Sequence, residues 1–115
     1  MKYKFVNVYD PVHKHYVALA CGNYTKWYNW VKSLDSTAPI EENNTSSGKY
    51  LSNGKYYFVW LKKKSDLGVL VHECDHLVND FMWRRGIKLD IENDESHAYL
   101  IEFWFNELKK NLKLL

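Results

Sequence analysis

The sequence predicts an α+β domain in which a small antiparallel sheet packs against three helices. Three observations lead to this class. Short runs of strand-forming residues come in pairs joined by turn residues, apolar residues recur with helical spacing in three other segments, and the order along the chain is β-β-α-β-β-α-α. Because neighbouring strands are joined by short turns, we expect antiparallel pairing, with the helices covering one face of the sheet.

The length of 115 residues fits one domain spanning 1–115. Hydrophobic residues make up 46% of the chain and aromatic residues 17% of it, which is enough to supply a core. The formal net charge of +2 produces only a weak electrostatic field, so the composition does not favour nucleic acid or an anionic membrane as partner. No run reaches the ~18 apolar residues of a membrane span, and the amino-terminal residues lack the apolar segment of a signal peptide. We therefore expect no membrane association.

The first half of the chain begins with two predicted strands, over 2–8 and 15–21, joined by a turn at Asp10-Pro11. A helix follows over 23–34, where apolar residues fall at i, i+3, i+4 and i+7. The polar segment 35–48 has no period and predicts a surface loop. Asn53-Gly54 then predicts a tight hairpin turn between strands over 49–52 and 55–61.

Two helices complete the prediction. Ser65 or Asp66 caps a long helix that runs to about Arg85 and ends at Gly86. The last helix begins near Asn93 or Asp94. Apolar stripes on both predict that they face the core.

The long helix contains the motif H-E-x-x-H, as His72-Glu73-Cys74-Asp75-His76. Histidines at i and i+4 stand one turn apart on one face, so both imidazoles reach one tetrahedral zinc ion. Glu73 lies beside that face, where a carboxylate acts as general base on a water that zinc activates. The alternative is a surface helix with two ordinary histidines. The apolar residues on both sides of the motif favour the zinc site, because burying ionisable groups without a purpose is costly.

Zinc needs a third protein ligand. The candidates downstream of the motif are one histidine and six acids: His97, Asp90, Glu92, Asp94, Glu95, Glu102 and Glu107. Glu95 is the best placed if the last helix folds back with its first turn near the metal, and Tyr99 and Glu102 share its face. His97 points about 200° away from Glu95 at 100° per residue, which makes it the weaker candidate.

The motifs V-H-E-C-D-H-L-V at 71–78, R-G-I-K-L at 85–89 and N-D-E-S-H-A-Y-L at 93–100 resemble those of short zincin-like proteins of phages and prophages. The segment is also similar to minimal gluzincin metallopeptidases of the ImmA/IrrE kind. The resemblance covers a little over a third of the chain, and it implies a zincin-like fold. It further implies His72 and His76 as zinc ligands, Glu73 as catalytic base and Glu95 as third ligand. The oxyanion helper of zincins is often a Tyr or His, for which the candidates here are Tyr99 and a residue of a loop.

Two positions depart from that family pattern. Asp75 stands between Glu73 and the second histidine, where such motifs carry uncharged residues, and it must face solvent or a polar neighbour. The residues after Glu95 read Ser-His-Ala-Tyr, where the family has a small residue, an amide, any residue and an aromatic.

Together these observations predict a zinc-dependent metallopeptidase that acts on a peptide or protein in the cytoplasm of a bacterial host. The rival is a non-catalytic zincin-fold binding protein of phage or prophage origin that engages a host or phage protein. A third reading, nucleic-acid binding through Lys62-Lys63-Lys64 and Arg84-Arg85, is the least favoured. The sequence does not specify the peptide or the oligomeric state.

Four further expectations concern single features. By resemblance, 56–60 is the sheet edge along which a substrate would lie, although its aromatics also suit a core. Asp80 is a candidate to orient the His76 ring. His13 and His15 share a strand face that more often indicates a wet surface than a metal. Cys21 and Cys74 are predicted to be buried thiols in a reducing compartment.

Overall fold

The computed structural model describes residues 2–11, 14–92 and 94–115. Its elements are β1 (Val6–Asp10), β2 (His15–Cys21), α1 (Tyr24–Leu34), β3 (Gly48–Ser52), β4 (Tyr57–Leu61), α2 (Leu67–Arg84) and α3 (Asp94–Leu112). The α+β class, the three helices and the order of the elements are as predicted. The expected pairing of His13 with His15 and the capping role of Asn93 lie outside the described residues.

The four strands form one mixed sheet in the order β1-β2-β4-β3. β1 pairs with β2 and β3 pairs with β4, both antiparallel, but β2 and β4 run parallel, with Val17 opposite Tyr57 and Cys21 opposite Leu61. The prediction of a wholly antiparallel sheet is therefore wrong for the central pair. The reason is the connection between the two pairs. After α1 and the segment that follows it, β3 begins at the end of the sheet where β2 stops, and the hairpin then places β4 between them, running parallel to β2.

The strand predicted to be the substrate edge is in the interior of the sheet. All five residues of β4 are buried, as expected of an apolar run covered on both faces. β3 is an edge strand instead, and it lies next to α2. The sheet edge that lies next to the motif helix is therefore β3 (Gly48–Ser52).

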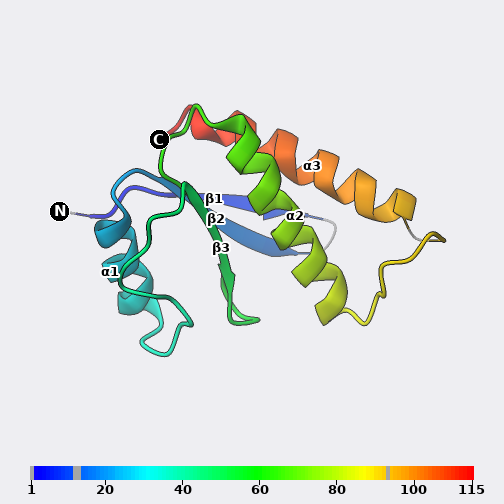
Figure 1. Ribbon diagram of the computed structural model, residues 1–115, viewed down its shortest axis with the longest axis horizontal. Coiled ribbons are helices and arrows are strands. Elements are labelled where there is room, and N and C mark those ends of the chain that lie inside the picture. The colour runs from blue at the N-terminus through cyan, green and yellow to red at the C-terminus, as the bar shows by residue number, and fades with distance from the viewer. Residues whose placement is uncertain (1, 12–13, 93) are drawn as a thin grey trace.

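Helices cover both faces of the sheet, not one (Figure 1). Val17, Leu19 and Val59 pack in one core with α2 and α3. Their sequence neighbours Ala18 and Phe58 pack on the opposite face with Trp27 and Val31 of α1. Alternate residues of β2 and β4 are thus buried on opposite faces, which the predicted one-sided packing did not allow.

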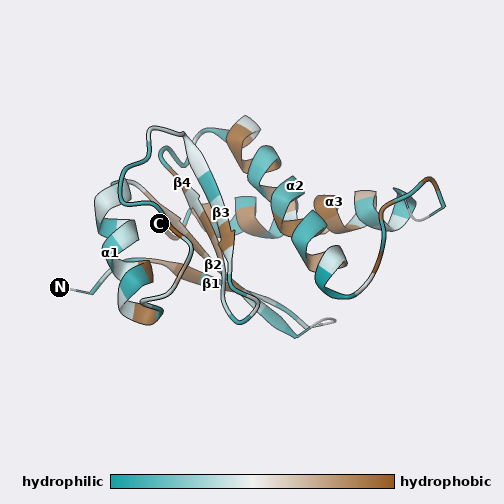
Figure 2. Ribbon diagram, turned by 60° about the horizontal axis from the view of Figure 1, so that its bottom comes forward, coloured by the Kyte–Doolittle hydropathy of each residue, from teal (hydrophilic) through white to brown (hydrophobic). Residues whose placement is uncertain are grey.

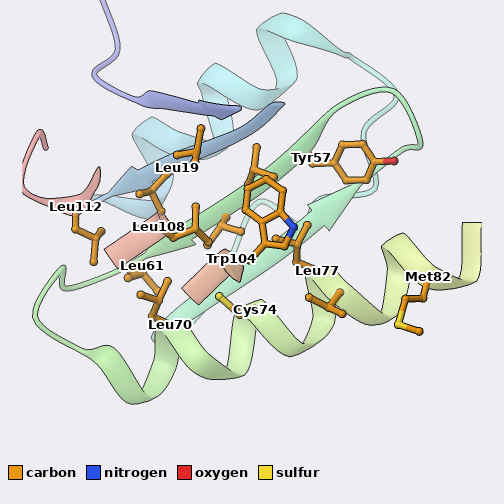
Figure 3. Packing of buried hydrophobic residues seen from close by; sticks show 14 residues of the cluster. Leu19, Tyr57, Leu61, Leu70, Cys74, Leu77, Met82, Trp104, Leu108 and Leu112 are labelled. Atoms are coloured by element: carbon orange, nitrogen blue, oxygen red, sulfur yellow. The ribbon is translucent and has the colours of Figure 1, made fainter. Parts of the chain in front are cut away.

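The helices that flank the sheet are amphipathic, and Figure 2 shows hydrophobic and hydrophilic residues alternating along α2 and α3. Leu70, Cys74 and Leu77 of α2 point toward Trp104 and the sheet (Figure 3). Cys74 is buried as predicted, whereas Cys21 is only half-buried. None of the helices in the described part of the chain is long and apolar enough to cross a membrane.

Local hydrogen bonds and backbone conformations set the ends of α2 and the turn between β3 and β4, as the sequence predicts. The Asp66 carboxylate accepts a hydrogen bond from the Val69 N–H at 3.2 Å and caps the helix. Gly86 follows the helix with φ +70°, the left-handed conformation of a helix stop. At the hairpin, Asn53 Oδ1 accepts hydrogen bonds from the N–H groups of Lys55 and Tyr56, each at 2.9 Å.

Candidate metal centre

His72 and His76 bring two imidazole nitrogens together on the exposed side of α2. Their Nε2 atoms are 3.2 Å apart. Two ligand atoms that bind one tetrahedral ion at ~2.0–2.1 Å are separated by about 3.3 Å, so the observed spacing fits a shared zinc ion. With Glu73 they form a group whose ligand atoms all lie within 4.8 Å of one another.

Glu73 differs from its two neighbours in being buried, with 5% of its surface exposed. Burial raises the pKa of its carboxyl group, while the nearby His72, His76 and Lys49 side chains oppose that rise. The backbone N–H of Tyr50 donates a hydrogen bond to the carboxylate. The base predicted from the motif is therefore held between α2 and the edge strand β3.

Gly48 permits this close approach. A Cβ atom at this position would lie 2.4 Å from Val69 Cγ1 and 3.1 Å from Glu73 Oε2. Both distances are shorter than ordinary van der Waals contacts, so the absence of a side chain allows β3 to lie directly against the motif helix. The sequence signals a glycine here but not its partner, because the register of β3 against α2 is a tertiary feature.

The centre opens into a hollow of about 310 Å³ between β3 and α2. It is lined by Gly48, Lys49, Tyr50, His72, Glu73 and His76. A second hollow of about 470 Å³ continues beyond the start of β3, past Ser47 and Ser46, toward the start of α2. The candidate metal-binding nitrogens of His72 and His76 therefore lie at an open trough beside an edge strand.

Tyr50 connects β3 to the carboxyl-terminal half of α2. Its hydroxyl donates a hydrogen bond to Asp80 Oδ2 at 2.6 Å, and the Arg84 Nε atom lies 3.0 Å from Asp80 Oδ1. Burial, followed by this contact with Asp80, raises the pKa of the Tyr50 hydroxyl. Both oxygens of Asp80 are thus engaged by Tyr50 and Arg84, in place of the predicted contact with His76.

α3 presents to α2 a different face from the one predicted. The His97 side chain is 12% exposed, with its Nε2 atom 2.7 Å from Asn79 Oδ1 and 3.6 Å from Asp75 Oδ1. Glu95 is exposed and is not part of the His72–Glu73–His76 cluster, and Tyr99 is 63% exposed. The expected rotation of α3 is wrong because its apolar stripe, not Glu95, sets which side packs on α2.

The two remaining polar expectations have clear outcomes. Asp75 is exposed and faces His97 and Asn79, so it has the polar surroundings that its position requires. Arg84 is bound to Asp80, and the Arg85 guanidinium lies over the Phe81 ring at 3.4 Å and contacts His15. Both arginines of the least favoured nucleic-acid reading therefore make contacts within the fold.

The comparisons with known proteins add no family to this description. No protein-family model, curated protein or solved structure matches the chain. What the centre does must therefore be argued from its own chemistry.

Proposed function

We propose that the protein is a zinc-dependent peptidase whose metal is held by His72 and His76 and whose general base is Glu73. The observation that carries the proposal is the 3.2 Å separation of the two Nε2 atoms beside a buried carboxylate. Two neutral imidazoles and an adjacent carboxylate are the donor set of zinc hydrolases, and the spacing fits tetrahedral coordination. The residues present therefore suit the ion.

Zinc, when bound, supplies a Lewis acid that lowers the pKa of a coordinated water toward ~7. Glu73 then accepts a proton from the attacking water and delivers it to the amine that leaves. Its burial against β3 fixes the carboxylate next to the two histidines, and the Tyr50 N–H holds its orientation. The exposed sides of both imidazoles leave room for a substrate carbonyl.

The substrate in this proposal is an extended peptide laid along β3. β3 pairs on one side with β4 and is a sheet edge on the other. An edge strand offers unpaired backbone donors and acceptors that bind a peptide as an added strand. The hollow along β3 is lined by both histidines and the one beyond the start of β3 by His72, and Glu73 lines both, so a peptide in this position would have its backbone beside Glu73.

The third ligand and the oxyanion donor remain proposals that rest on the resemblance. It implies Glu95 and Tyr99, both on α3 and both exposed. Glu95 lies in the first turn of α3, where residues 94–96 are all exposed, so few contacts oppose a local turn of this carboxylate toward the metal.

One observation favours a second candidate, a zincin-fold protein that binds a partner without cleaving it. The structure brings neither Glu95 nor Tyr99 to the centre. In this alternative, β3 would bind a partner strand of a phage or host protein, and Glu73 would have no chemical role. The substitution Glu73→Gln separates the two functions.

The test starts with protein purified without added zinc or chelator, for which we expect about one equivalent of zinc. We expect the wild type to cleave members of a mixed peptide library detected by mass spectrometry, and Glu73→Gln to keep the metal but lose cleavage. Glu102→Gln, an exposed glutamate on α3, is the matched control and should cleave normally. Cleavage that persists in Glu73→Gln, or wild type that binds zinc no better than micromolar, would overturn the proposal.

The proposed location is the cytoplasm of a bacterial host. Cys21 and Cys74 are both free thiols, which a reducing compartment preserves.

A further inference from the structure

A second surface lies on the face of the sheet opposite α2 and α3, where α1 leaves part of the strands uncovered. A hollow of about 410 Å³ opens here between the strands and the end of α1, and one of about 610 Å³ lies beside it. Trp30 lines both hollows. We call this surface the aromatic–basic face; it comprises Lys2, Tyr3, Lys4, Phe5, Lys14, Tyr16, Lys26, Trp30, Lys55 and Tyr56.

The aromatic–basic face carries positive charge without compensating carboxylates. Among the described residues that line its two hollows there are five lysines and neither Asp nor Glu. The weak net charge of the chain conceals this asymmetry. Residues 1–64 contain ten lysines and four acidic residues, a balance of +6, whereas residues 65–115 contain six basic and ten acidic residues, a balance of −4. The face therefore suits an anionic partner.

Flat rings with accessible sides accompany these lysines. Tyr16 is 58% exposed and Phe5 37% exposed. Trp30 lies between the rings of Tyr3 and Phe5, with centroid distances of 4.9 Å and 4.5 Å. The Tyr9 ring, 43% exposed, extends the set at 4.7 Å from Tyr16. Such rings on a sheet surface are platforms on which planar groups stack.

We propose that the aromatic–basic face binds single-stranded nucleic acid, with bases stacked on Tyr16 and Phe5 and phosphates beside Lys14 and Lys55. Proteins that bind single strands combine exposed aromatic rings, on which bases stack, with basic side chains that contact the phosphates. A double helix hides its bases in the stack and would not use the exposed rings. This site is separate from the metal centre, which lies between α2 and the far edge strand β3.

The shape of the face favours a nucleic acid over an anionic membrane. Aromatic and basic residues also occur at membrane interfaces, but there they lie on a protruding apolar surface that enters the headgroup layer. Here the rings of Trp30 and Phe58 line a hollow, and Phe58 is only 2% exposed. A base can insert into this hollow, whereas the hollow presents little protruding apolar surface that could enter a lipid layer.

The test is fluorescence anisotropy with fluorescein-labelled fifteen-nucleotide oligomers of thymidine or uridine, using the full chain in 50 mM NaCl. We expect saturable binding that weakens roughly fifteenfold when the salt is raised to 200 mM, as contact with about three phosphates requires. Tyr16→Ala should weaken binding at least fivefold through lost stacking, and Lys14→Ala with Lys55→Ala should reduce the salt dependence.

Matched controls lie on α3 and directly after it, away from this face. Phe103→Ala removes an exposed aromatic and Lys109→Ala with Lys113→Ala removes two exposed lysines, and both variants should bind as the wild type does. Glu73→Gln should also bind normally, which keeps this inference independent of the proposed peptidase. Circular dichroism checks that each variant is folded.

Three results would overturn the inference. The first is no anisotropy change with either oligomer at 50 mM NaCl. The second is equal loss of binding in the α3 controls, which would indicate nonspecific attraction. The third is binding to phosphatidylglycerol vesicles that Tyr16→Ala weakens while the oligomers do not bind, which would assign the face to a membrane.

Discussion

Gly48 is where the edge strand and the motif helix come closest, and it couples the stability of the fold to the candidate centre. A Cβ here would meet Val69 Cγ1 at 2.4 Å and Glu73 Oε2 at 3.1 Å. We expect Gly48→Ala to lower the free energy of unfolding by about 1–3 kcal/mol, because the core must shift to relieve the overlap. Urea denaturation measures this change.

The identity of the clash is tested by a second substitution. Val69→Ala removes the atom that the new Cβ would meet. Gly48→Ala should therefore lower the free energy of unfolding much less in the Val69→Ala background than in the wild type. Gly68→Ala is the matched control, because its Cβ would lie 3.7 Å from Asp66 Oδ1, an ordinary contact. A loss in Gly48→Ala that is unaffected by Val69→Ala would place the strain elsewhere.

The proposed third ligand gives a second prediction at the residue scale. If the exposed first turn of α3 moves so that Glu95 reaches the metal, as the proposal requires, Glu95→Ala should weaken zinc binding more than tenfold, which corresponds to more than ~1.4 kcal/mol. His97→Ala should change the affinity less than threefold, because its Nε2 is already hydrogen-bonded to Asn79 in the packed interface. Competition with a chromophoric chelator measures both affinities. The reverse order would show that α3 keeps its observed rotation and that the site has three histidines.

The part of the centre that the sequence predicted is the part that one helix determines. His72, Glu73 and His76 follow from the helical period, which depends only on neighbours in the chain. Tyr50 could not be found in this way, because its place beside the histidines depends on how β3 pairs and packs. The facing of Glu95 was wrong for the same reason, since contacts between helices set the rotation of α3.

At the scale of whole elements, the ends of α2 and the turn between β3 and β4 were predictable. The bounds of β1, predicted over 2–8 and observed at Val6–Asp10, and the order of strands were not. Asp66 and Gly86 delimit α2, and Asn53-Gly54 forms the hairpin turn, each by local backbone chemistry. The position of β4 between β2 and β3 depends on where the chain returns after α1. Its continuous burial was visible in the sequence as an apolar run, and that pattern indicates an interior strand more directly than an edge.

The core-facing side of α2 gives a prediction about pH. Burial raises the pKa of the Cys74 thiol to about 12 from its ordinary 9.0, with the nearby Glu73 charge adding to the rise. The stability that the protonated thiol contributes is fully present below pH 9, where the unfolded thiol is also protonated, and is lost as the pH rises toward 12. We expect the free energy of unfolding to decline through this window.

The variant Cys74→Ala isolates that contribution from other groups that titrate in the same range. Cys21 and Tyr3, with pKa values raised to about 11 and about 12, remain in the variant. The wild type should therefore lose stability faster than Cys74→Ala above pH 9, by no more than ~1.4 kcal/mol per pH unit. The free energy of unfolding of both proteins is measured by urea titration at pH 8, 9 and 10. If it falls with pH at the same rate in both, the Cys74 thiol ionises as readily in the folded protein as in the unfolded one.

Across the whole molecule, the two candidate surfaces lie on different parts of one sheet. The candidate metal centre is at the β3 edge beside α2, and the aromatic–basic face lies on the side that α1 partly covers. Neither could be assigned from total charge, because the positive first half and negative second half nearly cancel. If both proposals hold, a peptide along β3 and a nucleic acid beside α1 would occupy the protein without competing for the same residues.

The two cores share the central strands, and this predicts one cooperative unfolding transition. Val17 and Leu19 of β2 belong to the core under α2 and α3, while Ala18 and Ala20 belong to the core under α1. Losing either layer would therefore expose apolar residues of the strand that supports the other. Separate probes for the two layers test this coupling.

A variant with Trp83→Phe and Trp104→Phe provides these probes. It leaves tryptophan only at Trp27, Trp30 and Trp60, all in or against the core under α1. Trp104 tolerates the change because its buried indole N–H has no hydrogen-bond partner to lose. Far-ultraviolet circular dichroism mainly follows α2 and α3, with 18 and 19 residues against 11 in α1. We expect both signals to give the same urea midpoint; midpoints that separate would show that the layers unfold independently, despite the shared strands.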